Sequence, residues 1–241
     1  MDPTYGQQYR ELYHRHWWWR VREAEILREI RRVKPPAGSR ILDIGSGDGL
    51  FFDELSRFGR VEGIEPDVTL LDPDGPWRGA IHPVPFDERF QPGHQFDVIL
   101  MLDVLEHLET PVESLRHALR LLAAGGRIIV TVPAFQWLWT RHDDLNRHVR
   151  RYDRHSFAEL AREAGLEIRR TRYLFQWVVP AKLAVRGVQR FVSGPPRPPR
   201  IPPEPINRLL LAATRLEQSV NSVVPMPFGG SLLAVGGHPE G

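Results

Sequence analysis

Apolar and polar residues follow distinct patterns in successive parts of this chain. In residues 9–33, apolar side chains recur every three or four positions among charged ones, which predicts an amphipathic helix ended by Pro35, Pro36 and Gly38. From there to residue 175, short apolar runs alternate with stretches of helical periodicity. The runs predict strands at 40–44, 61–65, 96–101, 126–132 and 166–175, and the periodic stretches predict helices at 50–58, 111–123 and 155–164.

Strands that are apolar on both faces, with helices between them, are typical of a parallel, doubly wound α/β sheet. Beyond residue 175 the pattern changes. It predicts a helix at 178–192, an extended polyproline segment at 194–205, a helix at 206–221 and a closing strand at 231–235. We interpret this insertion as a lid that folds over the ligand edge of the sheet, with an ordinary packing appendage as the alternative. The predicted organisation is an N-terminal helical arm (1–38), a core (39–175), a helical lid with a Pro-rich segment (176–228) and the closing strand of the core (229–241).

Composition narrows the class of protein and its chemistry. The chain has 241 residues, 41% hydrophobic and 26% charged, which is the make-up of a globular rather than a disordered or fibrous protein. No apolar run reaches the roughly 18 residues that span a bilayer, and the N-terminus lacks the apolar segment of a signal peptide, so we expect a cytoplasmic protein. Because there is no cysteine, any catalysis must use histidine, carboxylates, tyrosine or a cofactor.

A glycine-rich turn follows the first predicted strand. Residues 41–49 read ILDIGSGDG, with glycines at 45, 47 and 49 that let the backbone approach a ligand closely. The next positions hold Leu50, Phe51 and Phe52 instead of the last glycine of a dinucleotide fingerprint, which disfavours NAD and FAD. Glu65 ends the second predicted strand, where a carboxylate can accept hydrogen bonds from both hydroxyls of a ribose.

With these motifs the chain resembles the class I S-adenosylmethionine-dependent methyltransferases over about residues 40–172. ILDIGSGDG is similar to their first motif, GIEPD to their acidic strand end and FDVILMLDVLEHL to their fourth-strand segment. The resemblance implies a Rossmann-like doubly wound seven-stranded sheet with a helical lid inserted before the last strand. It also implies S-adenosylmethionine as cofactor and S-adenosylhomocysteine as product. The implied cofactor-binding residues are Asp43, Gly45, Ser46, Gly47, Asp48, Gly49, Glu65, Leu102 and Asp103.

Each of these positions has an implied task. Gly45 and Gly47 pass under the methionine and ribose portions, Asp43 orients the loop, and Glu65 holds the ribose hydroxyls. Leu102 and Asp103 flank the cofactor and the substrate entrance. One departure concerns adenine: where the family often has an acid after the third strand, residues 80–82 read Ala-Ile-His.

The leading helix narrows the resemblance further. The segment from His16 to Arg22, HWWWRVR, is similar to the Trp- and Arg-rich leading helix of a bacterial subgroup that includes the ubiquinone-biosynthesis O-methyltransferases. This implies methyl transfer to an oxygen or nitrogen of a small molecule. A sulfonium methyl is already activated, so the protein must mainly align the reactants, exclude water and accept a proton.

Candidate catalytic residues follow the fourth and fifth predicted strands. We select His142 with its neighbour Asp143 as the leading base candidate, together with His107 and His148; the alternative is that these groups only brace their loops. Arg147, Arg150 and Arg151 are candidates for clamping an anionic group. Four residues also fall at positions similar to the divalent-metal ligands of the small-RNA 2′-O-methyltransferases: Asp103, Glu106, His107 and His148. Such ligands suit manganese, iron or zinc better than magnesium, but we expect no bound metal.

The acceptor is left open by the sequence. Aromatic residues that favour an apolar or planar acceptor are Phe135, Trp137, Trp139, Tyr173, Phe175 and Trp177. The apolar and basic helix at 178–192 allows a peripheral membrane contact or a lipid-linked substrate. We expect no DNA or RNA partner and a monomer or homodimer. Two alternatives remain: an RNA 2′-O-methyltransferase, and a non-catalytic methyltransferase-like subunit.

Overall fold

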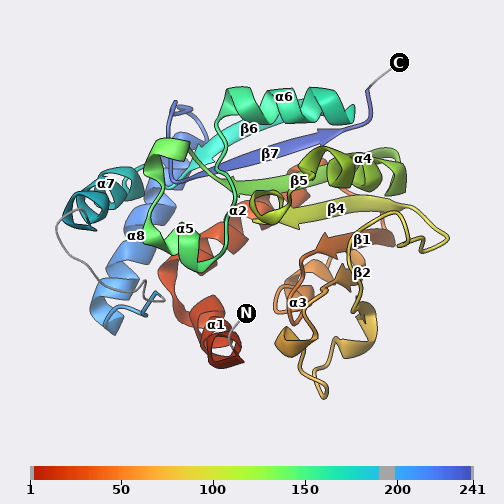
Figure 1. Cartoon of the computed structure of the whole chain (residues 1–241), viewed down its shortest axis with the longest axis horizontal. Helices are drawn as coiled ribbons and strands as arrows, with labels where there is room; N and C mark the ends of the chain where they lie inside the picture. The colour runs from red at the N-terminus through yellow and green to blue at the C-terminus, as the bar shows by residue number, and fades with distance from the viewer. Residues whose placement is uncertain (1–2, 190–198, 240–241) are drawn as a thin grey trace.

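The computed structural model describes residues 3–189 and 199–239, and Figure 1 shows one sheet with helices on both faces. The strands are β1 (Ser39–Ile44), β2 (Gly59–Ile64), β3 (Ile81–His82), β4 (Phe96–Leu102), β5 (Leu122–Pro133), β6 (Glu167–Leu174) and β7 (Ser231–Gly237). The α-helices are α1 (Pro3–Arg15), α2 (Trp17–Val33), α3 (Phe52–Leu55), α4 (Pro111–Leu121), α5 (Arg141–Leu145), α6 (Arg154–Ala164), α7 (Val178–Gln189) and α8 (Glu204–Asn221).

The strand order is β3-β2-β1-β4-β5-β7-β6. Strands β1 to β5 pair in parallel, and β7 is antiparallel to both of its neighbours. The expected Rossmann-like, doubly wound seven-stranded sheet is therefore confirmed. Because β1, β2, β4 and β5 run in one direction, the loops that follow them meet at one carboxyl edge, where ligands of such sheets bind.

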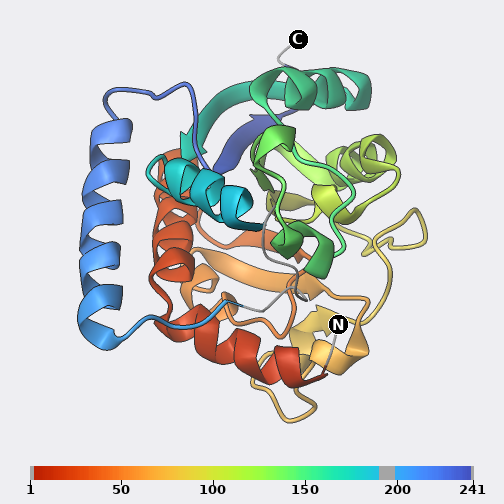
Figure 2. The same cartoon turned by 60° about the vertical axis from the view of Figure 1, so that its left-hand side comes forward.

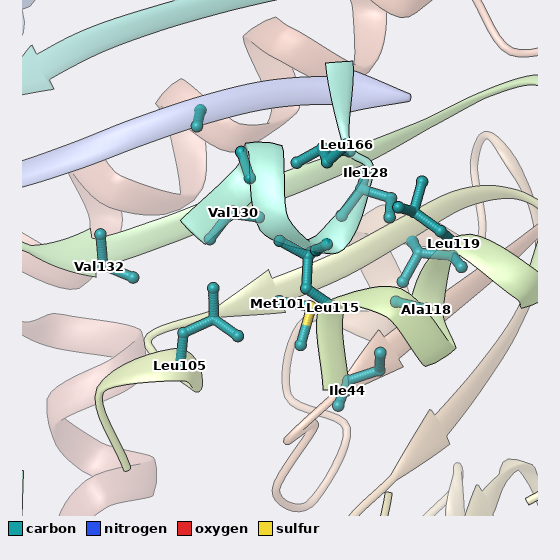
Figure 3. Packing of buried hydrophobic residues seen from close by; sticks show 14 of the residues in the cluster. Ile44, Met101, Leu105, Leu115, Ala118, Leu119, Ile128, Val130, Val132 and Leu166 are labelled. Carbon is teal, nitrogen blue, oxygen red and sulfur yellow. The ribbon is translucent and has the colours of Figure 1, made fainter. Parts of the chain in front are cut away.

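Alternate residues of the central strands enter two separate cores. Ile99 and Met101 face the helices α4 and α6, whereas Val98 and Leu100 face α2 and α3. Figure 3 shows the first core, in which Leu115 from α4 packs between the sheet residues. Burial on both faces explains why these strands read as unbroken apolar runs.

Most predicted elements match, and the differences have local causes. The single helix expected over 9–33 is broken at His16, whose side chain accepts a hydrogen bond from Trp18 N at 3.2 Å and caps α2. The helix expected over 50–58 is confined to α3. Helix α6 ends as expected at Gly165, which has a φ of 84°.

The insertion does not fold as one lid. Helix α7 lies at the carboxyl edge, where Arg186 donates to the carbonyl of Trp137. Helix α8 instead packs beside α2, on the outside of the molecule (Figure 2). Residues 190–198, which include the end of the helix expected at 178–192 and the first part of the polyproline segment expected at 194–205, lie outside the described residues. Within the described ranges, no helix combines the length and apolarity needed to cross a membrane.

Buried ions join the arm to the sheet, a feature that the sequence pattern did not indicate. Arg172 of β6 is 2% exposed and pairs with Glu25 of α2, and Glu29 lies 3.8 Å from the same guanidinium. Removing one partner from such a pair leaves an uncompensated buried charge, which is strongly destabilising. This network fixes α2 against the far end of the sheet and so determines where its N-terminal half meets the carboxyl edge.

Candidate active site

The glycine loop between β1 and α3 has the conformation that glycine alone adopts easily. Gly45, Gly47 and Gly49 have φ values of 75°, 54° and 69°. A Cβ on Gly45 would lie 2.8 Å from Val104, whereas a Cβ on Gly47 would meet no atom within 4 Å. Gly45 N and Ser46 N donate to the carbonyl of Ile64, which ties the loop to the end of β2. The loop is rigidly held and open on the side of Gly47.

Glu65 follows β2 and is 7% exposed. Its Oε2 accepts a hydrogen bond from Gly47 N at 3.0 Å, and its Oε1 accepts one from Asp67 N at 2.9 Å. Burial raises the pKa of this carboxyl above its usual value. Each carboxylate oxygen can accept a second bond, so Glu65 retains one acceptor position on each oxygen for the two hydroxyls of a ribose.

Asp43 lies on β1 beneath the loop and is 4% exposed. Burial raises its pKa to about 7, an effect that Arg22 opposes and Glu65 reinforces. A carboxyl with a pKa near neutrality can change its charge when a cation binds beside it. Asp43 is thus placed to respond to a positively charged cofactor.

The N-terminal arm closes this half of the edge. Arg10 of α1 pairs with Asp48, and its Nη1 donates to Asp72 Oδ2 at 3.2 Å. A cavity of about 60 Å³ remains between the arm and the sheet. It is lined by Tyr9, Tyr13, Arg22, Asp43, Gly45, Ser46, Asp48, Leu50, Phe51 and Leu102. Small-molecule sites usually occupy about 300 Å³ or more, so this cavity is smaller than a nucleoside-sized ligand needs.

Two residues predicted to bind cofactor are engaged with the arm. Asp48 holds Arg10 and also accepts from Asp72 N at 2.7 Å. Asp103 has a left-handed φ of 57°, and its Oδ2 lies 2.6 Å from Nη2 of Arg22. Neither pairing was expected from the sequence, in which Arg22 is noted only as the end of the Arg-rich leading segment, because nothing local to Arg10 or Arg22 indicates partners so far along the chain.

Asp143 organises the other half of the edge, the loop that follows β5, which we take as the candidate acceptor half. It is fully buried and accepts from Thr140 N at 2.8 Å and from Arg151 Nε at 2.9 Å and Nη2 at 2.9 Å. Its Oδ1 also lies 2.8 Å from Nδ1 of His148. Burial alone would raise the pKa of this carboxyl, but the hydrogen bonds from His148 and Arg151 outweigh it and hold the pKa well below the usual range.

The expected pairing of His142 with Asp143 is wrong. His142 Nε2 lies 3.0 Å from the amide nitrogen of Asn146, and burial together with Lys182 lowers the pKa of His142 to about 4. Asp143 instead orients His148, five residues later, because the turn after α5 brings that ring back over the carboxylate. A histidine with so low a pKa is a weak base, which makes His148 the better base candidate.

Two of the predicted anion clamps have other partners. Arg151 is 6% exposed and donates hydrogen bonds to Asp143 and, from Nη1, to the carbonyl of Ala134 at 2.8 Å. Arg150 donates to the carbonyl of Glu109 at 3.1 Å. Lys182 of α7 was not selected from the sequence, yet it faces this loop: burial and Arg151 lower its pKa to about 8.

Glu106, His107 and His148 converge beside this network. One ligand atom of each lies within 4.8 Å of the others, and the two imidazole rings are 4.8 Å apart and perpendicular. Glu106 is fully buried with both oxygens lacking a hydrogen-bond partner, and burial and Asp103 raise its pKa well above the usual value. These three residues form a donor set that could hold manganese, iron or zinc, whereas Asp103, the fourth predicted ligand, is paired with Arg22.

The fold and loop geometry agree with comparisons to known proteins. Residues 18–171 match the family model described as a methyltransferase domain. The chain belongs to this family. It is an S-adenosylmethionine-dependent methyltransferase, and the glycine loop and Glu65 described above fit that cofactor.

Individual relatives support the same assignment. The chain is 26% identical over 201 residues to a ubiquinone biosynthesis O-methyltransferase of Aromatoleum aromaticum, a match that covers 76% of this chain and 79% of the relative. Matches to several other enzymes of that name span less than half of their length.

Solved structures share the fold. A TehB-like methyltransferase of Corynebacterium glutamicum has a TM-score of 0.55 and 19% identity over 99% of this chain and 100% of that chain. The N-methyltransferase NodS of Bradyrhizobium japonicum, solved with S-adenosylhomocysteine, has a TM-score of 0.52 and 17% identity over 92% of this chain and 88% of that chain.

Proposed function

We propose that this methyltransferase transfers a methyl group to a hydroxyl oxygen of a small, aromatic or lipid-linked acceptor. The observation that carries the proposal is the pair of the half-buried His148 and the fully buried Asp143, 2.8 Å apart, at the carboxyl edge of the sheet. An oxygen nucleophile gains most from a base that removes its proton. The relatives named as ubiquinone biosynthesis O-methyltransferases also favour an oxygen.

The proposed reaction assigns one task to each half of the edge. S-adenosylmethionine, when bound, supplies an activated methyl group on a sulfonium. The glycine loop, Asp43 and Glu65 hold it, with Leu102 at the mouth. On the acceptor side, His148 Nε2 takes the hydroxyl proton as the oxygen–carbon bond forms and the carbon–sulfur bond breaks. Asp143 fixes the ring through Nδ1 and stabilises the charge that the imidazole gains.

The remaining predicted residues receive supporting tasks in this proposal. His107, whose pKa is lowered by burial and by His148, packs against the base. His142 and Lys182 line the loop under α7, which we propose as the part of the insertion that closes over the acceptor. We further propose that the reaction needs no metal ion, because Asp143 and Arg151 already fix the charge balance around the base.

The test is a competition among acceptors with matched variants. Purified protein is supplied with S-adenosylmethionine and catechols, phenols, primary amines or a short single-stranded RNA, and methylated products are identified by mass spectrometry. We expect phenolic hydroxyls to be methylated and His148→Ala to reduce that product strongly while cofactor binding is retained. Methylation of amines alone would contradict the choice of oxygen.

RNA 2′-O-methylation remains the second candidate because of the donor set formed by Glu106, His107 and His148. It would show as methylated RNA whose yield depends on added manganese and falls steeply with salt. Cofactor binding without any methylated product would instead favour the non-catalytic subunit.

A further inference from the structure

Helix α8 has its polar side turned inward and its apolar side turned outward. The side that faces the body carries Asn207, Thr214, Gln218 and Asn221, each at most 3% exposed, together with Leu211. The outer side is apolar and open. Its large members are Ile206, Leu209, Leu216 and Val220, and Val223 and Val224 continue the row in the turn that follows α8; all of them are 50% to 80% exposed. A helix on the surface of a monomer normally has the opposite arrangement.

Hydrogen bonds explain how a polar face can anchor the helix. Asn207 accepts from Trp17 N at 3.0 Å and donates to the carbonyl of Arg15 at 2.8 Å. Thr214 accepts from Trp177 Nε1 at 2.9 Å. At the other end, Asn221 donates to the carbonyl of Tyr173 at 2.6 Å. These bonds fix the rotation of α8 about its axis, so its apolar side cannot turn inward.

The outer side has the spacing of a coiled-coil seam. Apolar residues recur at alternating intervals of three and four: Ile206, Leu209, Ala213, Leu216, Val220 and Val223. At 1.5 Å per residue the seam is about 25 Å long. Among the described residues nothing covers it, and in Figure 2 α8 forms the outer margin of the molecule.

We infer that this seam is a homodimer interface in which α8 pairs antiparallel with α8 of a second copy. In one register every seam residue meets a seam residue across a two-fold axis. Ile206 opposes Val223 of the partner subunit, Leu209 opposes Val220 of the partner subunit, and Ala213 opposes Leu216 of the partner subunit. Large side chains thereby face smaller ones, which lets the two rows interdigitate.

Charge favours a second copy over a lipid surface. The charged residues of α8 are Glu204, Arg208, Arg215 and Glu217. Their charges sum to zero and these residues lie off the seam, so two copies of α8 would not repel each other. Helices that lie on membranes carry basic residues beside the apolar face. The neutral α8 would therefore not be attracted to anionic lipid. The exposed apolar side chains lie in one row rather than singly, and such rows are characteristic of interaction sites rather than of ordinary monomer surfaces.

The first experiment measures mass. At about 50 µM, within the range of transient interfaces, light scattering should give twice the chain mass of 27.8 kDa. Leu216→Glu should convert the protein to monomer, because it places a charge in the middle of the seam. The matched control is Val68→Glu, a similarly exposed valine far from α8, which should remain dimeric. Retained S-adenosylmethionine binding by Leu216→Glu shows that the variant is folded.

The second experiment tests the register. The chain has no cysteine, so Ile206→Cys and Val223→Cys each introduce a single thiol. Oxidation of a mixture should cross-link the two variants to each other, while neither cross-links with itself, because like positions lie about 25 Å apart in an antiparallel pair. Self-cross-linking of each variant alone would contradict the antiparallel register.

A wild-type monomer at that concentration overturns the proposal. Sedimentation with phosphatidylcholine–phosphatidylglycerol vesicles then identifies the alternative occupant: binding that Leu216→Glu abolishes would assign the seam to lipid, and no binding would assign it to another protein. None of these outcomes depends on the proposed acceptor or base.

Discussion

The cofactor half of the carboxyl edge is built mainly from backbone, whereas the acceptor half is built from side chains. Around the loop at 45–49, the essential features are left-handed glycines and amide donors, with Glu65 as their acceptor. Around Asp143, four donor groups from Thr140, His148 and Arg151 converge on one buried carboxylate. The difference teaches that the proposed cofactor binding depends on a local sequence motif, whereas the proposed proton transfer depends on a network of side chains from several parts of the fold.

The sharpest way to break the comparison is to fill the glycine loop. Gly47→Arg should weaken S-adenosylmethionine binding by about 100-fold or more, because a long side chain at this left-handed, open position occupies the pocket. Calorimetric titration measures the effect. Gly125→Arg is the matched control, since that glycine also has a positive φ and open space but lies near the start of β5, at the opposite edge of the sheet. Tight binding by Gly47→Arg would contradict the assigned cofactor site.

A second change separates the two candidate bases. His148→Ala should lower kcat by about 100-fold, the usual contribution of a general base, with cofactor affinity unchanged. His142→Ala should lower kcat by only about threefold and also leave affinity unchanged, since its pKa of about 4 makes it a weak base. Steady-state rates with the methylated acceptor measure both. If His142→Ala lowered kcat more than His148→Ala, the general base would be His142 instead of His148.

A smaller effect should appear as pH dependence in the cofactor half. The pKa of Asp43 is about 7 without cofactor, so the carboxyl is charged above pH 7 and neutral below it. Only the charged form attracts a cationic cofactor; affinity should therefore fall by about fivefold as pH drops from 7 to 6. Titrations at both pH values measure this. Asp43→Asn should bind more weakly at high pH and lose the dependence, and an unchanged slope in that variant would assign the proton elsewhere.

The smallest expected effect is that of chelation. Burial and Asp103 raise the pKa of Glu106, which disfavours the charged carboxylate that a cation would need; removing divalent ions with EDTA should therefore leave kcat within about twofold. The assay compares treated protein with protein resupplied with manganese. A loss of activity that manganese restores, and that Glu106→Gln abolishes, would make Glu106, His107 and His148 a metal site.

Much of the fold was predictable because it depends on local pattern. The apolar runs of β1, β4 and β5 reflect burial on both faces, and Gly165 ended α6 as expected. The pairing of Asp143 was not predictable, because adjacency to His142 says nothing about the direction in which either side chain points. The lid was predicted for the whole insertion, yet the inward amides of α8 attach that helix to α2 instead.

The sequence by itself determined six of the seven strands and most of the longer helices, the glycine loop and the acidic residue after β2, because each depends on neighbours within a few positions; it did not predict the short elements β3 and α5. Only the tertiary structure decided that Arg10 and Arg22 pair with Asp48 and Asp103 at the glycine-loop half of the edge, and that Asp143 hydrogen-bonds to His148. It also decided that the apolar side of α8 faces outward. These relations join residues that lie far apart in the chain or differ only in side-chain direction, and packing alone selects among the partners that the sequence allows.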